Sequence, residues 1–399
     1  MRAVVVSTGT GKGVEHGIAK AINGCNPTLV VYFVTEKSKN TVDLVKPLLN
    51  SDYSSEQFFI ADENDFEKCY SDAKKVLGKL VKKGYSPENI TVDFTSGTKA
   101  MSAGLVLAAV SLECNAISYV YGERDEGGRV ISGTERNMIL TPTEIIADKR
   151  KELAALLFNK YQYEGCLELI KNVKAMTQNE KVLGKFNLLE TSAKVYSAFD
   201  KFDHENAMKY LKELGKGNEQ EMCINTYNNK ILLHREIESK KYSLEEIADL
   251  VENAKRRGGE GKFDDAIARL YRVIELLAQF RLWSKHNIDS SDVDTHRIPK
   301  DYRGYYEKMR KNGTISIGLK KAYKLLEDLN DSIGKDFSNN PEILKVLNWR
   351  NYSILAHGTK PINREQYEGA LKVVENFAVK YFPELKQMME QACFPKVKI

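Results

Sequence analysis

The sequence predicts a Rossmann-like α/β domain at the N-terminus, followed by an all-α part that ends in a helical bundle. Five short runs rich in β-branched and aromatic residues recur at 2–7, 28–34, 57–60, 90–95 and 115–121. Segments whose apolar residues have helical spacing lie between these runs. From residue 143 onward the apolar spacing is helical throughout. Near-continuous apolar strands that alternate with helices are typical of a parallel sheet covered on both faces.

Composition sets the broad class. The chain has 399 residues, of which 42% are hydrophobic and 29% charged, which is typical of a globular protein with two or more domains. The formal charge of +5 (60 basic minus 55 acidic residues) permits nucleic acid as a partner without requiring it. The six cysteines form no CxxC pair, so we expect reduced thiols. The apolar runs are too short for a signal peptide or a membrane span, and we expect a cytoplasmic protein.

The covering helices and the edge of the sheet follow from local patterns. Residues 65–83 carry apolar side chains on one helical face, and 100–112 form a short apolar helix. Gly127-Gly128 predicts a turn before 129–132, and 137–140 follows. We expect these last segments to add an antiparallel edge that closes the domain near residue 142.

Two glycine-rich loops follow the first and fourth predicted strands. They read STGTGKG from Ser7 and DFTSGTKAM from Asp93. Ligands of such sheets bind outside the carboxyl ends of the strands, and hydroxyls, free amides and lysines suit phosphate oxygens. The sequence therefore predicts a site for a phosphate-bearing ligand, with tight turns as the alternative. Neither loop is GxGxxG or a P-loop, which argues against a nucleotide-dependent metabolic enzyme.

The helical part divides into a connector, 143–255, and a bundle, 256–399. Stretches with paired glycines at 213–221 and 256–261 are the expected joints. In the bundle, Arg269, Arg272 and Arg281 are candidates to contact RNA, although ion pairing is the more ordinary role. A cluster of tyrosines, Tyr302, Tyr305 and Tyr306, is suited either to stacking on bases or to packing in the bundle.

The stretch WRNYSILAHG, residues 349–358, holds the candidate catalytic side chains of the bundle. Asn340 and Pro341 are expected to open its helix, and Gly358 to end it. On a continuous helix Arg350 and His357 would share one face roughly 10 Å apart along the axis. His357 would lie in the last turn, where the helix dipole favours the imidazolium and raises the pKa toward neutrality. The ordinary alternative is that both side chains merely meet free carbonyls there.

These motifs carry a family resemblance at both ends of the chain. DFTSGTKAM resembles the D-x-T-x-G-T-K-x-M motif of the CARF sensor domain, and STGTG resembles the first ligand loop of that domain. RNYSILAH resembles the R-x4-6-H motif of HEPN ribonucleases. The chain thus resembles the CARF-HEPN ribonucleases of type III CRISPR systems. The resemblance implies a CARF domain at 1–142, a helical connector at 143–255 and a HEPN domain at 256–399.

The resemblance implies a homodimer whose CARF domains bind a cyclic oligoadenylate that activates cleavage of single-stranded RNA. No metal or other cofactor is implied for catalysis. The implied catalytic residues, drawn from both chains, are Arg350, Asn351 and His357. The implied ligand-binding residues are Ser7, Thr8, Gly9, Thr10, Thr95, Ser96, Gly97, Thr98, Lys99 and Met101.

Three questions stay open at the level of sequence. A ligand-sensing regulatory protein without nuclease activity is the main alternative, although no clear helix-turn-helix with a basic recognition helix is present. The sensor loops also contain Thr, Ser and Lys groups of the kind that would let them cleave their own activator. The ring size of the activator, the base preference and the acid or base role of His357 have no signature in the sequence.

Overall fold

The computed structural model describes residues 2–114, 116–126, 130–131, 133–214, 224–239 and 241–398. The chain separates into two compact units. One unit holds residues 1–150 with 177–182, and the other holds 151–176 with 183–399. Each unit has its own hydrophobic core, so each is described in its own right.

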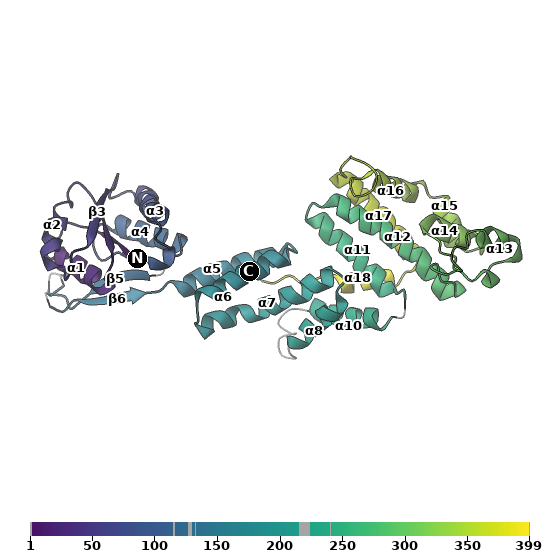
Figure 1. Ribbon diagram of the computed structural model, residues 1–399, viewed down its shortest axis with the longest axis horizontal. Helices are drawn as coiled ribbons and strands as arrows, with labels where there is room; N and C mark the ends of the chain where they lie inside the picture. Colours follow the sequence, from purple (N-terminus) through teal and green to yellow (C-terminus); the bar gives the residue numbers. More distant parts are fainter. Residues whose placement is uncertain are drawn as a thin grey trace. The chain divides into compact units, whose positions relative to one another are not determined.

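A six-stranded sheet organises the first unit (Figure 1). Its order is β3-β2-β1-β4-β5-β6, in which the first five strands run parallel and β6 pairs antiparallel with β5. The strands are β1 (Ala3–Ser7), β2 (Leu29–Val34), β3 (Ser54–Phe59), β4 (Ile90–Asp93), β5 (Ala116–Tyr121) and β6 (Arg136–Leu140). The predicted Rossmann-like sheet with an antiparallel edge is confirmed.

The β3 strand begins three residues before its predicted start at Gln57. Its first residues are polar and exposed, and their intrinsic strand propensity is low. They are nevertheless extended because β2 pairs with them in register from Leu29–Ser54 to Val34–Phe59. Pairing with a buried neighbour thus overrides local propensity at this edge.

Helices cover both faces of the sheet. On one face, α1 (Val14–Cys25) and α2 (Thr41–Val45) pack with one set of strand side chains. On the other face lie α3 (Phe66–Lys82) and α4 (Lys99–Ser111), which pack with the alternate set. The α3 helix begins where predicted because the Asp65 carboxylate accepts the backbone N–H of Lys68. Of the predicted turn and strand at the edge, residues 127–129 and 132 lie outside the described residues.

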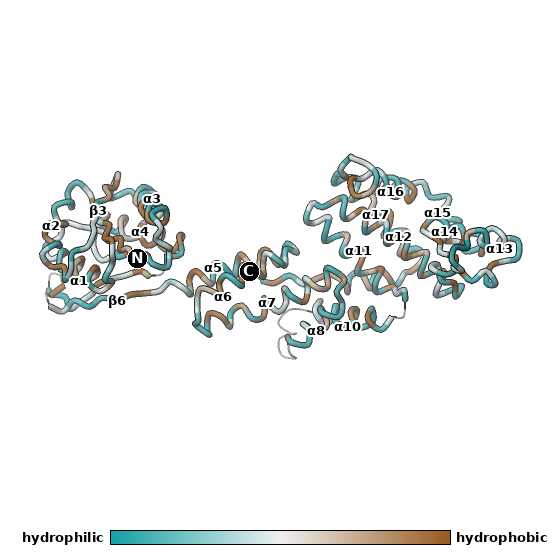
Figure 2. Tube along the Cα trace, viewed as in Figure 1, coloured by the Kyte–Doolittle hydropathy of each residue, from teal (hydrophilic) through white to brown (hydrophobic). Residues whose placement is uncertain are grey.

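The second unit is helical throughout its described elements. Hydrophobic stretches alternate with polar ones along its helices (Figure 2), as expected when one face of each helix is buried. With α5, which begins before the unit, its helices are α5 (Thr143–Asn159), α6 (Tyr163–Met176), α7 (Glu180–Asp200), α8 (His204–Glu213), α10 (Ile224–Glu238), α11 (Leu244–Gly259), α12 (Phe263–His286), α13 (Lys300–Glu307), α14 (Leu319–Asp328), α15 (Ser332–Ser338), α16 (Pro341–Tyr352), α17 (Arg364–Tyr381) and α18 (Leu385–Ala392).

The α11 helix belongs to the core of the bundle. Its apolar residues from Ile247 to Ala254 lie in one buried cluster with those of α12, α14, α16 and α17. Residue 255, the predicted end of the connector, is therefore in the interior of a helix. The expected joint at 256–261 is helical up to Gly259, and the chain turns at Gly261, whose φ is 78°. Most of the other expected joint, 213–221, lies outside the described residues.

One close approach fixes α17 against α11. A Cβ placed on Gly258 would lie 2.1 Å from Cζ of Tyr367. The tyrosine ring therefore occupies the space that any other side chain at 258 would need. Within the described part of the chain, no helix is both long enough and apolar enough to cross a membrane.

Candidate ligand pocket and catalytic motif

The two glycine-rich loops of the first unit meet at the point where strand order reverses. β1 pairs in parallel with β2 on one side and with β4 on the other. The chain crosses from β1 to β2 in one direction, while β4 lies on the opposite side, so the loops after β1 and β4 leave the same edge of the sheet side by side. A Cβ placed on Gly9 would lie 2.9 Å from both the backbone nitrogen of Gly97 and Oγ of Ser96. Only glycine at position 9 allows this contact between the loops.

Hydrogen bonds join the loops to each other. The backbone N–H of Gly9 donates to Oγ of Ser96 at 2.9 Å, and the Ser7 hydroxyl donates to the Ser96 carbonyl. Ser7 and Thr8 are both buried, and Ser7 supports the loops from beneath. The family resemblance implied that both residues line the pocket. In the structure Thr8 lines the cavity and Ser7 does not.

The loop after β4 is held in the same way. Oγ1 of Thr95 donates to Asp93 at 2.9 Å and accepts the backbone N–H of Val120 at 2.8 Å. Asp93 is buried, and burial raises its pKa to about 6. Thr98 is the N-cap of α4: its hydroxyl accepts the N–H of Met101 and donates to the Glu63 carbonyl. These hydroxyls shape the loop through bonds within the protein.

A cavity of about 360 Å³ opens between the loops. Of the ten predicted ligand residues, the structure brings eight to its wall, with Ser7 beneath it and Lys99 exposed on the first turn of α4. The eight are Thr8, Gly9, Thr10, Thr95, Ser96, Gly97, Thr98 and Met101.

The loops after β2 and β3 form a third wall of this cavity, which was not predicted from the sequence. Thr35, Lys37 and Ser38 follow β2, and Glu63 follows β3. Both strands end at the same edge of the sheet as β1 and β4, which is the signal that would have found these residues. A neighbouring cavity of about 250 Å³ shares Thr95 and Ser96 and adds Lys12 and Arg124 as cationic residues.

The candidate catalytic motif lies at the end of α16, and one prediction about it is wrong. Asn340 caps the helix as predicted: its side chain accepts the N–H groups of Glu342 and Ile343, and Pro341 is in the first turn. The helix ends at Tyr352, however, so His357 is not in its last turn. The helix therefore does not carry Arg350 and His357 on one face, and its last turn does not contain the imidazole.

The early end of α16 has a local cause. Ser353 leaves the helical conformation with ψ of 161°, and its hydroxyl donates to the Arg350 carbonyl at 2.9 Å. The chain then turns back, and the backbone N–H of His357 donates to the Asn351 carbonyl at 3.2 Å. Gly358 makes the turn possible, since a Cβ there would lie 1.7 Å from the carbonyl oxygen of Tyr352. The turn thus brings His357 to the end of the helix.

Arg350, Asn351 and His357 consequently share one region of the surface. The Arg350 guanidinium lies 4.7 Å from the ring centroid of Tyr271 on α12, and its NH1 donates to Oδ1 of Asn351 at 3.3 Å. These contacts orient a half-buried cation. His357 is exposed. Arg350 is therefore held in place, while His357 faces solvent.

Apolar side chains surround the motif. Tyr352 is 71% exposed, Ile354 60% and Leu355 54%. Three large apolar residues exposed within four positions are unusual on a surface that meets only water. They leave an apolar rim beside the Arg350 and His357 side chains.

The other RNA-contact candidates have structural partners. Arg269 bonds to Asn253 and Asp265, Arg272 to Glu275 and Gln279, and Arg281 to Asp331. Tyr306 is buried and donates to Asp328 at 2.8 Å. Tyr302 and Tyr305 remain 41% and 50% exposed. Ion pairing, the ordinary alternative for the arginines, is what the structure shows.

Comparison with known proteins gives matches along most of the chain. Residues 146–250 match the family model of the Csm6 6H domain, and residues 234–380 match that of the Csm6 HEPN domain. The CRISPR system endoribonuclease Csm6 of Thermus thermophilus is 26% identical over 306 residues, which cover 70% of this chain and 63% of that protein.

A solved structure has the same fold over almost the whole chain. Enterococcus italicus Csm6 bound to cyclic hexa-2′-fluoro-hexa-dAMP matches with a TM-score of 0.61. The two are 16% identical, and the match covers 98% of this chain and 99% of that one. The sheet, the intervening helices and the terminal bundle therefore occur in the same order in both.

Proposed function

We propose that this chain, which belongs to the Csm6 family of CRISPR-associated CARF-HEPN proteins, is an endoribonuclease of type III CRISPR defence that a cyclic oligoadenylate activates. One observation carries the proposal. The segment that matches the Csm6 HEPN domain contains α16 and the turn that gathers Arg350, Asn351 and His357 on one surface. The Thermus relative is named an endoribonuclease, which supports the same activity here.

The proposed chemistry is cleavage by the RNA itself. The 2′-OH of a nucleotide attacks the adjacent phosphorus, the bond to the 5′-oxygen breaks, and the products are a 2′,3′-cyclic phosphate and a 5′-OH. The negative charge that develops on the phosphorane is stabilised by the oriented Arg350 guanidinium. The exposed imidazole of His357 takes part in proton transfer or binds and orients the phosphate. Asn351 positions Arg350 through its 3.3 Å hydrogen bond.

A second copy of the chain completes the site in this proposal. The motif of a single chain contains one arginine and one histidine. The reaction needs a proton-transfer group at the attacking oxygen and another at the leaving oxygen. The exposed side chains of Tyr352, Ile354 and Leu355 border the motif, and a two-fold partner would cover them. Isologous pairing would then place both copies of the motif at one cleft.

The proposed activator site is the cavity between the loops after β1 and β4. A cyclic oligoadenylate carries one negative charge per phosphate, and the backbone amide of Gly97 together with the Thr10 hydroxyl suits those oxygens. The exposed Lys99 and the Lys12 side chain supply positive charge at the rim. The ligand in the Enterococcus structure is a cyclic hexanucleotide analogue, which supports a cyclic ligand for this chain.

The domain assignment follows from the same proposal. We assign residues 1–142 to the sensor, 143–243 to the connector and 244–399 to the ribonuclease, which moves the predicted boundary at residue 255 to the start of α11. Because α11 lies in the core of the bundle, we assign its residues from Leu244 to the folding unit of the ribonuclease.

The test is a cleavage assay on labelled single-stranded RNA in EDTA, with cyclic tetra-adenylate, cyclic hexa-adenylate or neither. Activator-dependent cleavage with 2′,3′-cyclic phosphate ends is expected. His357→Ala should lose roughly 100-fold or more of the activated rate. His296→Ala, at an exposed position of a short 3-10 helix in the same unit, is the matched control and should keep it.

Absence of cleavage with either ring would contradict the ribonuclease proposal and favour the regulatory alternative. Cleavage that survives His357→Ala would place the active site elsewhere. The His357→Ala chain also reports on the sensor, because loss of intact activator in its presence would show that the sensor loops cleave their ligand.

A further inference from the structure

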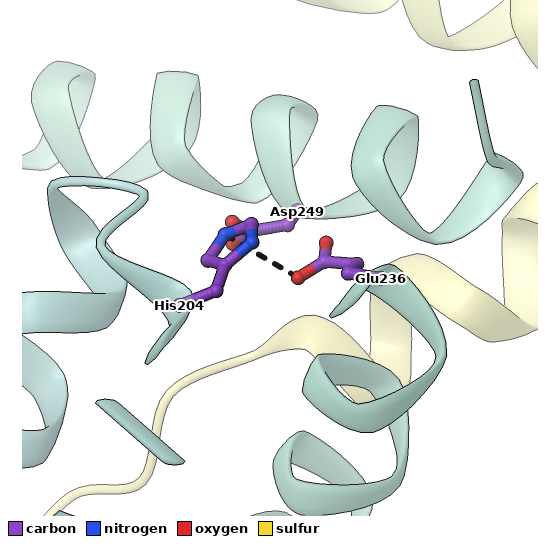
Figure 3. A group of neighbouring side chains, drawn as sticks. All are labelled: His204, Glu236 and Asp249. Carbon is purple, nitrogen blue, oxygen red and sulfur yellow. Dashed lines mark ion pairs between the residues drawn. The ribbon is translucent and has the colours of Figure 1, made fainter. Parts of the chain in front are cut away.

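A buried group of metal-binding residue types lies in the second unit, away from the α16 motif. His204 at the start of α8, Glu236 near the end of α10 and Asp249 in the middle of α11 converge (Figure 3). One donor atom from each residue lies within 4.8 Å of those of the other two. The Nε2 atom of His204 is 3.4 Å from Oε2 of Glu236.

The carboxylates of this group are buried and incompletely bonded. The side chain of Glu236 is 2% exposed and that of Asp249 is fully buried. Within the described part of the chain, neither Glu236 oxygen accepts a hydrogen bond, and neither does Oδ2 of Asp249. Nε2 of His204 also makes no hydrogen bond to the described residues. Buried polar atoms in native proteins are normally satisfied, so these four point to an additional ligand.

The surrounding charges do not satisfy the group. Arg256 bonds to Oδ1 of Asp249 at 3.1 Å and to Asp200 at 2.8 Å, so one guanidinium serves two carboxylates. Glu236 has no comparable cation among the ion pairs of the described residues, apart from the nearby imidazole. Burying a carboxylate without a positive partner is unfavourable, because the charge loses its hydration. A cation between Glu236 and Asp249 would remove that cost.

We propose that His204, Glu236 and Asp249 bind one divalent transition-metal ion of the zinc type. One imidazole nitrogen and two carboxylate oxygens are a usual ligand set for Zn²⁺ or Mn²⁺, whereas Ca²⁺ and Mg²⁺ prefer oxygen alone. Ligands at about 2.0–2.2 Å from a tetrahedral ion are ~3.3 Å apart, close to the separation of Nε2 and Oε2.

The surroundings suit a structural ion. The rings of Phe199 and Phe202 flank the imidazole at centroid distances of 5.8 and 5.9 Å and hold its orientation. The His204 side chain is 20% exposed, which provides a route of entry from solvent. The ion would join α8 and α10 to α11, a helix of the bundle core. It plays no part in the proposed RNA cleavage, whose residues lie on and after α16.

The experiment uses the full chain without a histidine tag. The protein is stripped with EDTA, reconstituted with Zn²⁺ or Mn²⁺, desalted and assayed by elemental analysis, and Co²⁺ is added as a visible-absorption probe. About one ion per chain is expected, with a higher unfolding temperature in the presence of metal. His204→Ala and Glu236→Gln should each retain less than about a tenth of that ion.

The helix α10 offers a matched control on either side of Glu236. His234 and Glu238 form an exposed pair on α10, with Nδ1 and Oε2 3.2 Å apart. The double variant His234→Ala with Glu238→Gln should keep the full ion content. Circular dichroism establishes that each variant is folded, and His204→Gln, which keeps most of the ring volume, replaces His204→Ala if the latter fails to fold.

Two results would overturn the proposal. One is a folded wild-type chain that holds no ion after reconstitution with either metal. The other is equal ion content in wild type and in the folded site variants. In the first case, a Glu236→Gln chain as stable as wild type would show that Glu236 is buried in its protonated form instead.

Discussion

The loops of the first unit and the motif of the second unit are built in opposite ways. At the sensor loops, Thr95, Ser96 and Thr98 use their hydroxyls on bonds within the protein, and the glycines bring the loops into contact. At the end of α16, the His357 side chain is exposed and apolar residues face outward beside it. One site is held by its own chain, whereas the other has a surface suited to a partner.

The difference bears on how each site responds to change. A preorganised pocket binds its ligand without having to order its loops first, so substitutions there should alter affinity and loop stability together. In the proposed dimer the site depends on assembly, so substitutions at its rim should alter activity through association of the two chains. Four predictions test this contrast, beginning with the largest effect.

Gly358→Ala is expected to have the largest effect. The new Cβ would overlap the Tyr352 carbonyl, where an ideal Cβ lies 1.7 Å away, so the turn must open and His357 must move. We expect activated RNA cleavage to fall by roughly 100-fold, because a displaced group is lost to catalysis. Gly369→Ala is the control, since a Cβ on that glycine of α17 meets nothing within 4 Å. Equal activity of the two variants would contradict the role of the turn.

Charging the apolar rim should have the next largest effect. In Ile354→Glu with Leu355→Glu, two like charges per chain would face a two-fold partner, which disfavours association. Sedimentation should show a weaker dimer, and cleavage should fall by roughly tenfold or more and recover at higher protein concentration. Leu44→Glu, at a position with 59% exposure on α2, controls for loss of an exposed apolar side chain. Full activity in a monomeric double variant would show that one chain suffices.

Two neighbouring residues of the sensor loop should separate contact from support. Lys99→Ala removes an exposed charge, so we expect weaker activator binding by about tenfold with an unchanged unfolding temperature. Thr98→Ala removes the cap of α4 and the bond to the Glu63 carbonyl. It should weaken binding and also cost about 1 kcal/mol of stability. Calorimetric titration and thermal unfolding measure the two quantities, and identical profiles for both variants would contradict the division of roles.

The smallest expected effect is on stability, and it depends on pH. Burial raises the pKa of Asp93 from 3.8 to about 6, so the folded state holds its proton more tightly than the unfolded state. The associated stability is present below pH 3.8 and is lost as pH rises through 6. Asp93→Asn does not ionise and can still accept the Thr95 N–H. Its stability relative to wild type should therefore rise between pH 4 and pH 7, measured by hydrogen exchange in residues 90–101. A constant difference would contradict the shift.

The sequence predicted the fold well where apolar patterns are long. The parallel strands, the helices α3 and α4, the Asn340 cap and the paired loops were all predicted from periodicity and known capping chemistry. The edge strand β3 and the end of α16 were less accessible, since pairing with β2 and the hydroxyl of Ser353 decide them. Neither strand pairing nor a single side-chain hydrogen bond produces a periodic pattern of apolar residues.

The candidate sites show the same division. Loop composition predicted a ligand site, and the family resemblance identified most of its wall, but Thr35 and Glu63 reach it from strands whose loops carry no glycine-rich signal. His204, Glu236 and Asp249 are far apart in sequence and come together only through the packing of three helices. The spacing of histidines and cysteines in the sequence therefore gave no indication of this group.

The buried helix α11 also limits how such a protein can be rearranged. Its residues from Ile247 to Ala254 share one apolar cluster with α12, α14, α16 and α17, and both matched family segments reach into or across it. A chimera joined near residue 142, between β6 and α5, would exchange one sheet domain for another and leave this cluster whole. A junction at residue 255 would divide a hydrophobic interior between two parents. Recombination among relatives should accordingly favour crossovers before α5 over crossovers within α11.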